Sequence, residues 1–104
     1  EEIDFDVRLF AQSWPAVNTD PRSELVQIMQ GAIVDQVGAE RPITGYNQGS
    51  DSRYFATAGI PVVIFGPSDP AVGHAPNEHV AVSALLEATR IYALTALRLL
   101  EARS

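Results

Sequence analysis

Two short loops carry the side chains that could do chemistry. One loop places Asp51 and Arg53 directly after a glycine-rich turn at residues 45–49, and the other places His74 and Glu78 beyond an apolar run. A guanidinium grips a carboxylate through two parallel hydrogen bonds, and a neutral imidazole is a good zinc ligand. These residue types make both loops candidates for chemistry, and a single histidine would supply only part of a zinc site.

Spacing alone does not assemble a complete site from these residues. No Ser/His/Asp triad and no phosphate-binding loop of the known types is present, and zinc requires three or four protein ligands. Simpler alternatives stay open: Asp51 as a helix cap, Arg53 as a surface cation and His74 as a loop residue bonded to backbone. The position of the loops at opposite ends of one helix–strand unit puts a functional interpretation on an equal footing with these alternatives.

The elements that must position these loops follow from the surrounding pattern. Ser50 or Asp51 can cap a short helix that runs to about Ala58. Residues 60–65 are apolar without interruption, which predicts a strand buried on both faces, as in parallel sheets covered by helices. Residues 41–46 are a second short strand candidate. Loops at strand ends of such α/β sheets commonly bind ligands.

The amino-terminal residues predict a further strand. Apolar residues alternate with charged ones over residues 3–10, namely Ile3, Phe5, Val7 and Leu9. A lone strand with one apolar face needs partner strands. Residues 13–19 follow as an extended connector, because Trp14 precedes Pro15 and is biased away from helix.

The first long helix has clear boundaries in the sequence. Asp20 is predicted as its N-cap, Pro21 suits the first helical position, and Gly38 supplies a left-handed stop. The apolar residues between them recur at helical spacing: Leu25, Met29, Ile33 and Val37. This helix is predicted to pack and to carry no chemistry.

The last helix, over residues 80–103, is apolar around most of its circumference. Its charged residues project onto one narrow stripe, namely Glu87, Arg90, Arg98 and Glu101. Two short strands and one other long helix can hardly cover so wide an apolar arc. We therefore expect either the rest of a larger protein or an oligomer interface to cover it.

Length, charge and composition narrow the function classes. The 104 residues fit one small domain, and 46% hydrophobic residues predict a globular chain. The net charge of −6 argues against nucleic acid or anionic membrane as a partner. No apolar run reaches the roughly 20 residues of a membrane span. The absence of cysteine fits a reducing compartment, so we expect a cytoplasmic protein.

Three motifs in order give the chain a family resemblance. Residues 49–55 read GSDSRYF, residues 59–61 and 65–67 read GIP and FGP, and residues 74–80 read HAPNEHV. This series resembles the carboxy-terminal part of the M20 metallopeptidases, which include succinyl-diaminopimelate desuccinylase, acetylornithine deacetylase and aminoacylases. Ser68 departs from the Phe-Gly-Pro-Gly that members often show.

The resemblance implies a fold and a division of the chain. It implies the carboxy-terminal portion of an α/β, zinc-exopeptidase-like three-layer sandwich. Residues 1–19 would be the last strand of the lid domain and its connector, and residues 20–104 the end of the catalytic domain. Because the chain opens on Glu1 without an initiator methionine, we expect a mid-protein start, processing or deliberate truncation.

The resemblance also implies roles within a dinuclear zinc amidohydrolase, with cobalt or manganese as possible substitutes. His74 matches a histidine metal ligand, and Arg53 matches an arginine that binds a substrate carboxylate. The remaining assignments are Gly49 and Ser50 beside that carboxylate, Asp51 bracing the turn, and Asn77 and Glu78 supporting the His74 loop. His79 matches a variable position and receives no role.

The other ligands and the general base belong to the family's upstream half. The resemblance therefore implies that this chain is inactive alone, acts with an amino-terminal catalytic half, and forms a homodimer. Arg53 favours a carboxylate-bearing N-acyl amino acid or dipeptide as the substrate. Two alternatives remain: a non-catalytic α/β binding or dimerisation module derived from that fold, and a regulatory partner of a separate catalytic chain.

Overall fold

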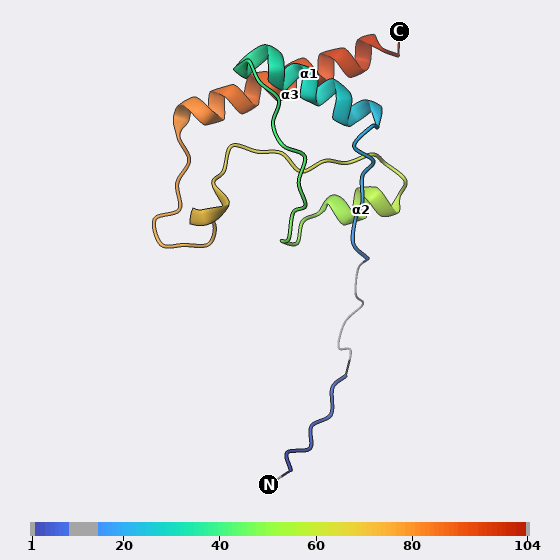
Figure 1. Ribbon diagram of the computed structural model, residues 1–104, viewed down its shortest axis with the longest axis vertical. Helices are drawn as coiled ribbons and strands as arrows, with labels where there is room; N and C mark the ends of the chain where they lie inside the picture. The colour runs from blue at the N-terminus through green and yellow to red at the C-terminus, as the bar shows by residue number, and fades with distance from the viewer. Residues whose placement is uncertain (1, 9–14, 104) are drawn as a thin grey trace.

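Two segments with apolar residues at helical spacing fold as the long helices of the protein. In the computed structural model, which describes residues 2–8 and 15–103, α1 spans Glu24–Val37 and α3 spans Val82–Glu101. They lie side by side and antiparallel (Figure 1). Their contact forms a small hydrophobic core in which the buried side chains are Met29, Ala32, Ile33 and Ile91.

The boundaries of α1 confirm one sequence prediction and correct another. Gly38 ends the helix in the left-handed conformation, with φ 79°, and donates its N–H to the carbonyl of Val34. The predicted N-cap at Asp20 is wrong, because the helix begins one turn later after Ser23. Asp20 instead forms a turn: its carboxylate accepts the N–H of Arg22, and its carbonyl accepts that of Ser23.

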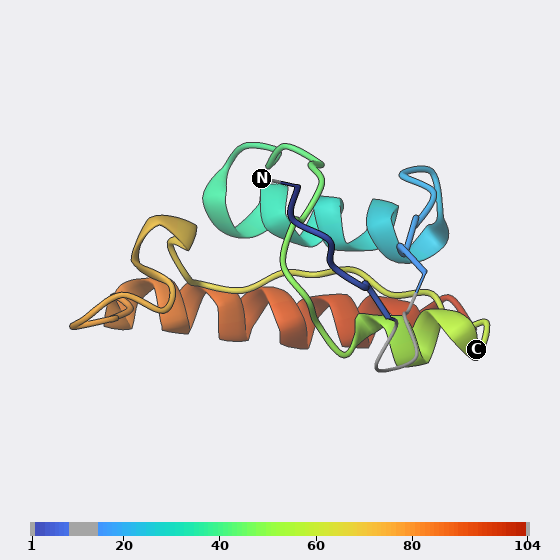
Figure 2. The same cartoon turned by 90° about the horizontal axis from the view of Figure 1, so that it is seen from below.

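Two short helical segments follow the glycine-rich turn. The helix α2 spans Ser52–Thr57, within one or two residues of the prediction, and a 3₁₀ turn, η1, spans Pro70–Val72. Asp69 caps η1 by accepting the N–H of Ala71 at 2.9 Å. These two elements bracket the extended residues 60–65, which run beneath the α1–α3 pair (Figures 1 and 2).

The predicted α/β sandwich is wrong for the chain as the structure has it. The described residues form helices and no strand, and no backbone hydrogen bond joins residues 41–46 to residues 60–65. A strand requires a neighbour that completes its hydrogen-bond ladder, and neither segment has one. The amino-terminal strand also fails over its described part, residues 2–8; Leu9 and Phe10, like Ser13 and Trp14 of the connector, lie outside the described residues.

Side-chain contacts hold residues 62–65 against the helices in place of a ladder. Val63 and Phe65 pack on the core, and Phe65 meets Tyr92 of α3 edge-on, with ring centroids 5.4 Å apart. The Tyr92 hydroxyl donates to the Phe65 carbonyl, and the Thr19 hydroxyl donates to the Val62 carbonyl at 2.6 Å. The segment is thus fixed in an extended form without a sheet.

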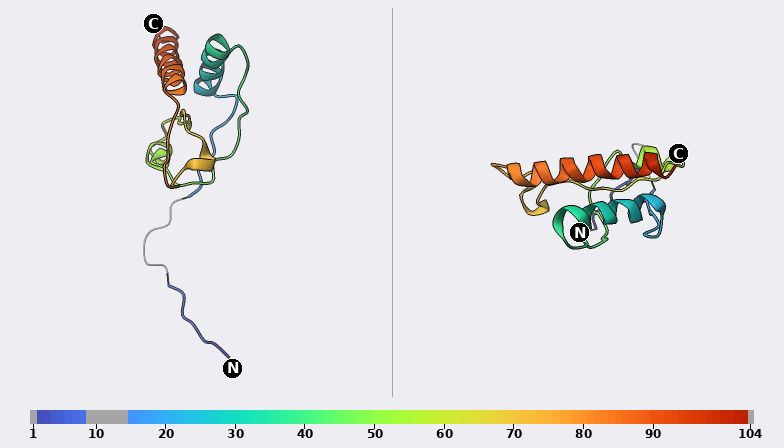
Figure 3. Two further views of the ribbon diagram at one scale, coloured as in Figure 1. Left: turned by 90° about the vertical axis from the view of Figure 1, so that its left-hand side faces the viewer. Right: turned by 90° about the horizontal axis from the view of Figure 1, so that it is seen from above.

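The molecule exposes far more surface than a compact domain of its size. Its accessible surface is 8663 Å², whereas a folded monomer of this mass exposes about 5,700 Å². Its radius of gyration is 18.1 Å, against about 13 Å for a compact chain of this length. Residues 2–8 extend away from the helices (Figure 3), and much of the apolar surface of α3 is uncovered, including Leu86, Leu97 and Leu100.

The long helices do not have the character of membrane spans. Within the described residues, no helix combines the length and apolar composition that crossing a bilayer would need. The apolar residues of α3 are interrupted by charged ones, among them Glu87, Arg90 and Arg98.

Candidate functional site

The turn before α2 is organised by two serine hydroxyls. The hydroxyls of Ser50 and Ser52 lie 2.6 Å apart, and the Ser50 hydroxyl also accepts the N–H of Ser52 at 3.2 Å. Asp51 occupies the N-cap position, but its carboxylate makes no capping hydrogen bond; its carbonyl accepts the N–H of Tyr54. Ser52 was not singled out from the sequence, although serines two residues apart at a helix start signal such a turn.

Arg53 lies on the first turn of α2, and the residue is half-buried. Its Nε is fully shielded from solvent, and its guanidinium carbon lies 5.1 Å from the centroid of the Tyr54 ring. A guanidinium against an aromatic face gains cation–π attraction, and the Arg53 Nη2 also donates to the Tyr54 hydroxyl at 3.4 Å. Arg53 is thus an oriented cation instead of a freely rotating surface side chain.

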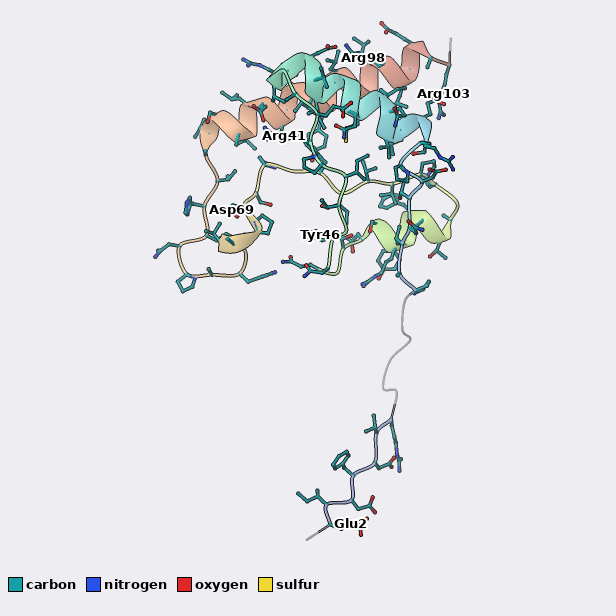
Figure 4. The ribbon with its side chains drawn as sticks, viewed as in Figure 1. Glu2, Arg41, Tyr46, Asp69, Arg98 and Arg103 are labelled. Atoms are coloured by element: carbon teal, nitrogen blue, oxygen red, sulfur yellow. The ribbon has the colours of Figure 1, made fainter. Side chains whose placement is uncertain are left out.

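A groove of about 680 Å³ brings together the three residues predicted to bind a carboxylate: Gly49, Ser50 and Arg53. Its walls come from residues 15–19 and Pro21, α1, residues 41–46 and 48–50, the start of α2 and residues 62–65. In Figure 4, Arg41 marks the part near the long helices and Tyr46 the part nearer α2. The groove therefore combines an apolar wall with a cationic, hydroxyl-bearing turn.

The His74 loop, between η1 and α3, is held by contacts within itself. Glu78 accepts the backbone N–H of His74 through its carboxylate at 3.2 Å, and donates its own N–H to the Ala75 carbonyl. His74 and Asn77 both adopt positive φ, at 60° and 61°. Non-glycine residues seldom adopt this conformation, so the loop has a specific shape.

His74 is exposed, and no other possible metal ligand of the described residues gathers around it in sufficient number. Among the described residues, no group of three His, Cys, Asp or Glu side chains is close enough together to hold an ion. An exposed imidazole can serve as one zinc ligand, whereas a zinc site needs three or four protein ligands. The donor set of a complete centre does not come together in residues 2–8 and 15–103.

The structure does not bring the two predicted loops into one site. No described residue beyond Phe65 lines the groove, so the His74 loop stands apart from Arg53. Figure 1 shows the two regions separated, with α2 on one side and η1 on the other. His79 bonds within its own loop: its Nδ1 lies 2.8 Å from the Asn77 carbonyl oxygen.

Comparisons with known proteins give relatives for nearly the whole chain. The succinyl-diaminopimelate desuccinylase of Azoarcus sp. (strain BH72) is 37% identical over 81 residues, which cover 78% of this chain and 21% of the relative. An N-formyl-4-amino-5-aminomethyl-2-methylpyrimidine deformylase of Bacillus subtilis (strain 168) is 37% identical over 79 residues, covering 75% and 18%. The chain spans about a fifth of the length of these relatives.

A third relative matches a longer part of the chain. The succinyl-diaminopimelate desuccinylase of Hydrogenovibrio crunogenus is 29% identical over 99 residues, which cover 95% of this chain and 26% of the relative. No solved structure matches the chain. Residues 2–98 match the family described as Peptidase family M20/M25/M40. With the turn of Arg53 and the loop of His74 both inside that match, the chain belongs to this family, as the three motifs predicted.

Proposed function

We propose that this chain is the carboxy-terminal part of a dinuclear zinc amidohydrolase that cleaves the amide bond of N-acyl amino acids or dipeptides. The observation that carries the proposal is the family match over residues 2–98, which includes both predicted loops. The relatives named as a desuccinylase and a deformylase both remove an acyl group, which supports hydrolysis of a C–N bond. Residues 1–19 would belong to a lid domain and residues 20–104 to the catalytic domain.

His74 contributes one metal ligand in this proposal. Its exposed imidazole leaves the ring accessible, and the contact between its backbone N–H and Glu78 supports the loop around it. Asn77 supports the shape of the same loop, because it adopts a left-handed backbone conformation that asparagine tolerates better than most residues. Zinc, or cobalt or manganese in its place, would supply Lewis-acid activation of water and of the amide carbonyl.

Arg53 binds the substrate carboxylate in this proposal, with Gly49 and Ser50 beside it. The packing of Arg53 against Tyr54 limits its rotamers, so less entropy is lost when its planar fork binds an anion. The Ser50–Ser52 hydroxyl pair fixes the turn that precedes it. Asp51 braces this turn through its backbone carbonyl.

The 104 residues alone would be inactive. The absence of a three-ligand group among the described residues supports this, because the remaining ligands and the general base would have to come from an amino-terminal catalytic half. The proposal includes a cytoplasmic location and a homodimer, with no nucleic acid or membrane partner. Detectable amide hydrolysis by the purified 104-residue chain with added zinc would contradict the inactivity.

The test of the proposal compares substitutions of two histidines in one loop. It uses the full-length protein that the complete reading frame encodes. His74→Ala should lower bound zinc and reduce hydrolysis of an N-succinyl amino acid by more than about 100-fold, since even residues that only support metal ligands contribute 10- to 100-fold. His79→Ala is the matched control and should leave zinc content and rate near wild type. Equal effects of the two substitutions, or none from His74→Ala, would favour the non-catalytic binding module.

Arg53→Lys tests the carboxylate anchor separately. Loss of one charged hydrogen bond weakens binding by about 1.5–3 kcal/mol, which corresponds to a KM about 10- to 100-fold higher. The zinc content should not change. An unchanged KM for a carboxylate-bearing substrate would remove Arg53 from the site.

A further inference from the structure

The side chain of Gln30, on α1, bonds to both backbone groups of Arg41. Its Nε2 donates to the Arg41 carbonyl at 2.6 Å, and its Oε1 accepts the Arg41 N–H at 3.3 Å. A primary amide carries both a donor and an acceptor, so one side chain can pair with a residue as a residue of a neighbouring strand would. Gln30 therefore supplies the two hydrogen bonds that a sheet would otherwise give to Arg41.

The surroundings of Gln30 explain why its amide is paired. Gln30 is half-buried and lies one turn from the buried residues Val26 and Ile33. A polar group on a buried helix face costs free energy unless it is hydrogen-bonded. Arg41 also reaches α3, where its Nη2 lies 3.7 Å from Glu87 Oε1, but the two side chains are 59% and 44% exposed. Solvent weakens such an ion pair, so the two amide hydrogen bonds are the main hold on Arg41.

Arg41 is the point at which the following residues, 42–49, are attached to the long helices. Of the backbone groups in residues 39–49, those of Arg41 alone hydrogen-bond to another segment of the chain that the structure describes. In Figure 4, Arg41 lies beside the long helices and Tyr46 lies toward α2. Residues 42–49 thus form an arm that begins at a fixed residue and ends at the turn before α2.

We propose that Gln30 is a positioning residue for the carboxylate-binding turn of Gly49, Ser50 and Arg53. By fixing Arg41, it sets where the arm begins and therefore where the arm delivers the turn. An arm without further backbone hydrogen bonds to another segment shifts when its attachment shifts, and misplacement of a binding group by about 1 Å is costly. The inference rests on the proposed function, because it requires that Arg53 bind a substrate carboxylate.

The test uses the full-length protein with Gln30→Met. Methionine has a similar length and helix propensity, but it has no N–H donor and only a weak acceptor. The KM for an N-acyl amino acid should rise by about tenfold, while kcat and zinc content stay near wild type. The KM for the carboxamide analogue of the same substrate, which lacks the carboxylate, should change little. Gln30→Glu, which when ionised keeps an acceptor and has no donor, replaces Gln30→Met if circular dichroism shows that chain to be unfolded.

Gln27→Met is the matched control on the same helix. The Gln27 Nε2 donates to the Pro21 carbonyl at 2.9 Å, so this substitution also removes a side-chain bond to backbone, but one outside the arm. It should leave KM near wild type. The double variant with Arg53→Lys gives a further check: because both residues act on one turn, Gln30→Met should raise KM by less when Arg53 is already replaced.

The outcomes separate this inference from the proposed function. An unchanged KM with Gln30→Met, where Arg53→Lys raises it, would overturn the inference and leave the proposed function standing. Equal rises for the carboxylate and carboxamide substrates, or fully additive effects in the double variant, would show that Gln30 only stabilises the fold. An unchanged KM with both single substitutions would remove Arg53 from the site and the positioning by Gln30 with it.

Discussion

At the scale of single residues, Gly38 shows how one position sets the end of an element. Its φ of 79° is a conformation that L-residues adopt at a cost, and a Cβ built on it would meet no atom within 4 Å. Gly38→Ala should therefore lower the free energy of unfolding by about 1 kcal/mol through backbone strain alone. Urea denaturation followed by circular dichroism measures this.

Gly31 provides the matched substitution within the same helix. It lies in the interior of α1, and a Cβ there would approach the Arg98 guanidinium at an ordinary 3.4 Å. Gly31→Ala should stabilise the protein by up to about 1 kcal/mol, because alanine loses less backbone entropy on folding. Effects of the same sign at both positions would contradict this account.

Some predicted roles depend only on contacts within one loop or turn, and others depend on groups elsewhere. Glu78 was assigned to the His74 loop, and the structure places its carboxylate on the His74 N–H. Asp20 was wrong as a cap, because its carboxylate accepts the N–H of Arg22 in a turn and the helix begins after Ser23. The roles of His74 and Arg53 toward metal and substrate remain predictions, since they depend on groups outside the described residues.

At the scale of elements, helices were predictable and strands were not. The helices α1, α2 and α3 satisfy their backbone groups within themselves, so residue spacing and caps were sufficient to place them within a few residues. Residues 60–65 have the composition of a buried strand, but a strand exists only through its neighbours. The sequence could not reveal that no neighbour would be present.

The contact of α1 with α3 carries most of the packing, which gives an element-scale prediction. Ile91 is 1% exposed in the core, and Ile91→Ala should lower the free energy of unfolding by about 2–5 kcal/mol. Leu97, on the same helix but 52% exposed, is the control, and Leu97→Ala should change it by less than about 0.5 kcal/mol. Chemical denaturation of both variants makes the comparison. A large effect at Leu97 would show that α3 is covered in solution.

At the scale of the whole molecule, the chain leaves much of its apolar surface uncovered. Only one face of α3 contacts α1, and residues such as Val82 and Leu86 stay open. The expectation that a larger protein or an oligomer partner covers them stays a prediction. The core that the sequence predicted from Met29 and Ile33 is present, but it is small. Composition could show that apolar surface exists, but not which molecule covers it.

The large accessible surface also has a calorimetric consequence. Relative to an extended chain of the same mass, which exposes about 16,000 Å², the 8663 Å² that remain exposed correspond to about 0.7 of the burial of a compact domain. The heat-capacity change on unfolding should fall in proportion, to about 1.0 kcal/mol/K instead of about 1.4. With a smaller enthalpy of unfolding as well, the melting transition should be broad and the stability curve shallow. Binding of a partner to the exposed surface should therefore sharpen the peak in scanning calorimetry.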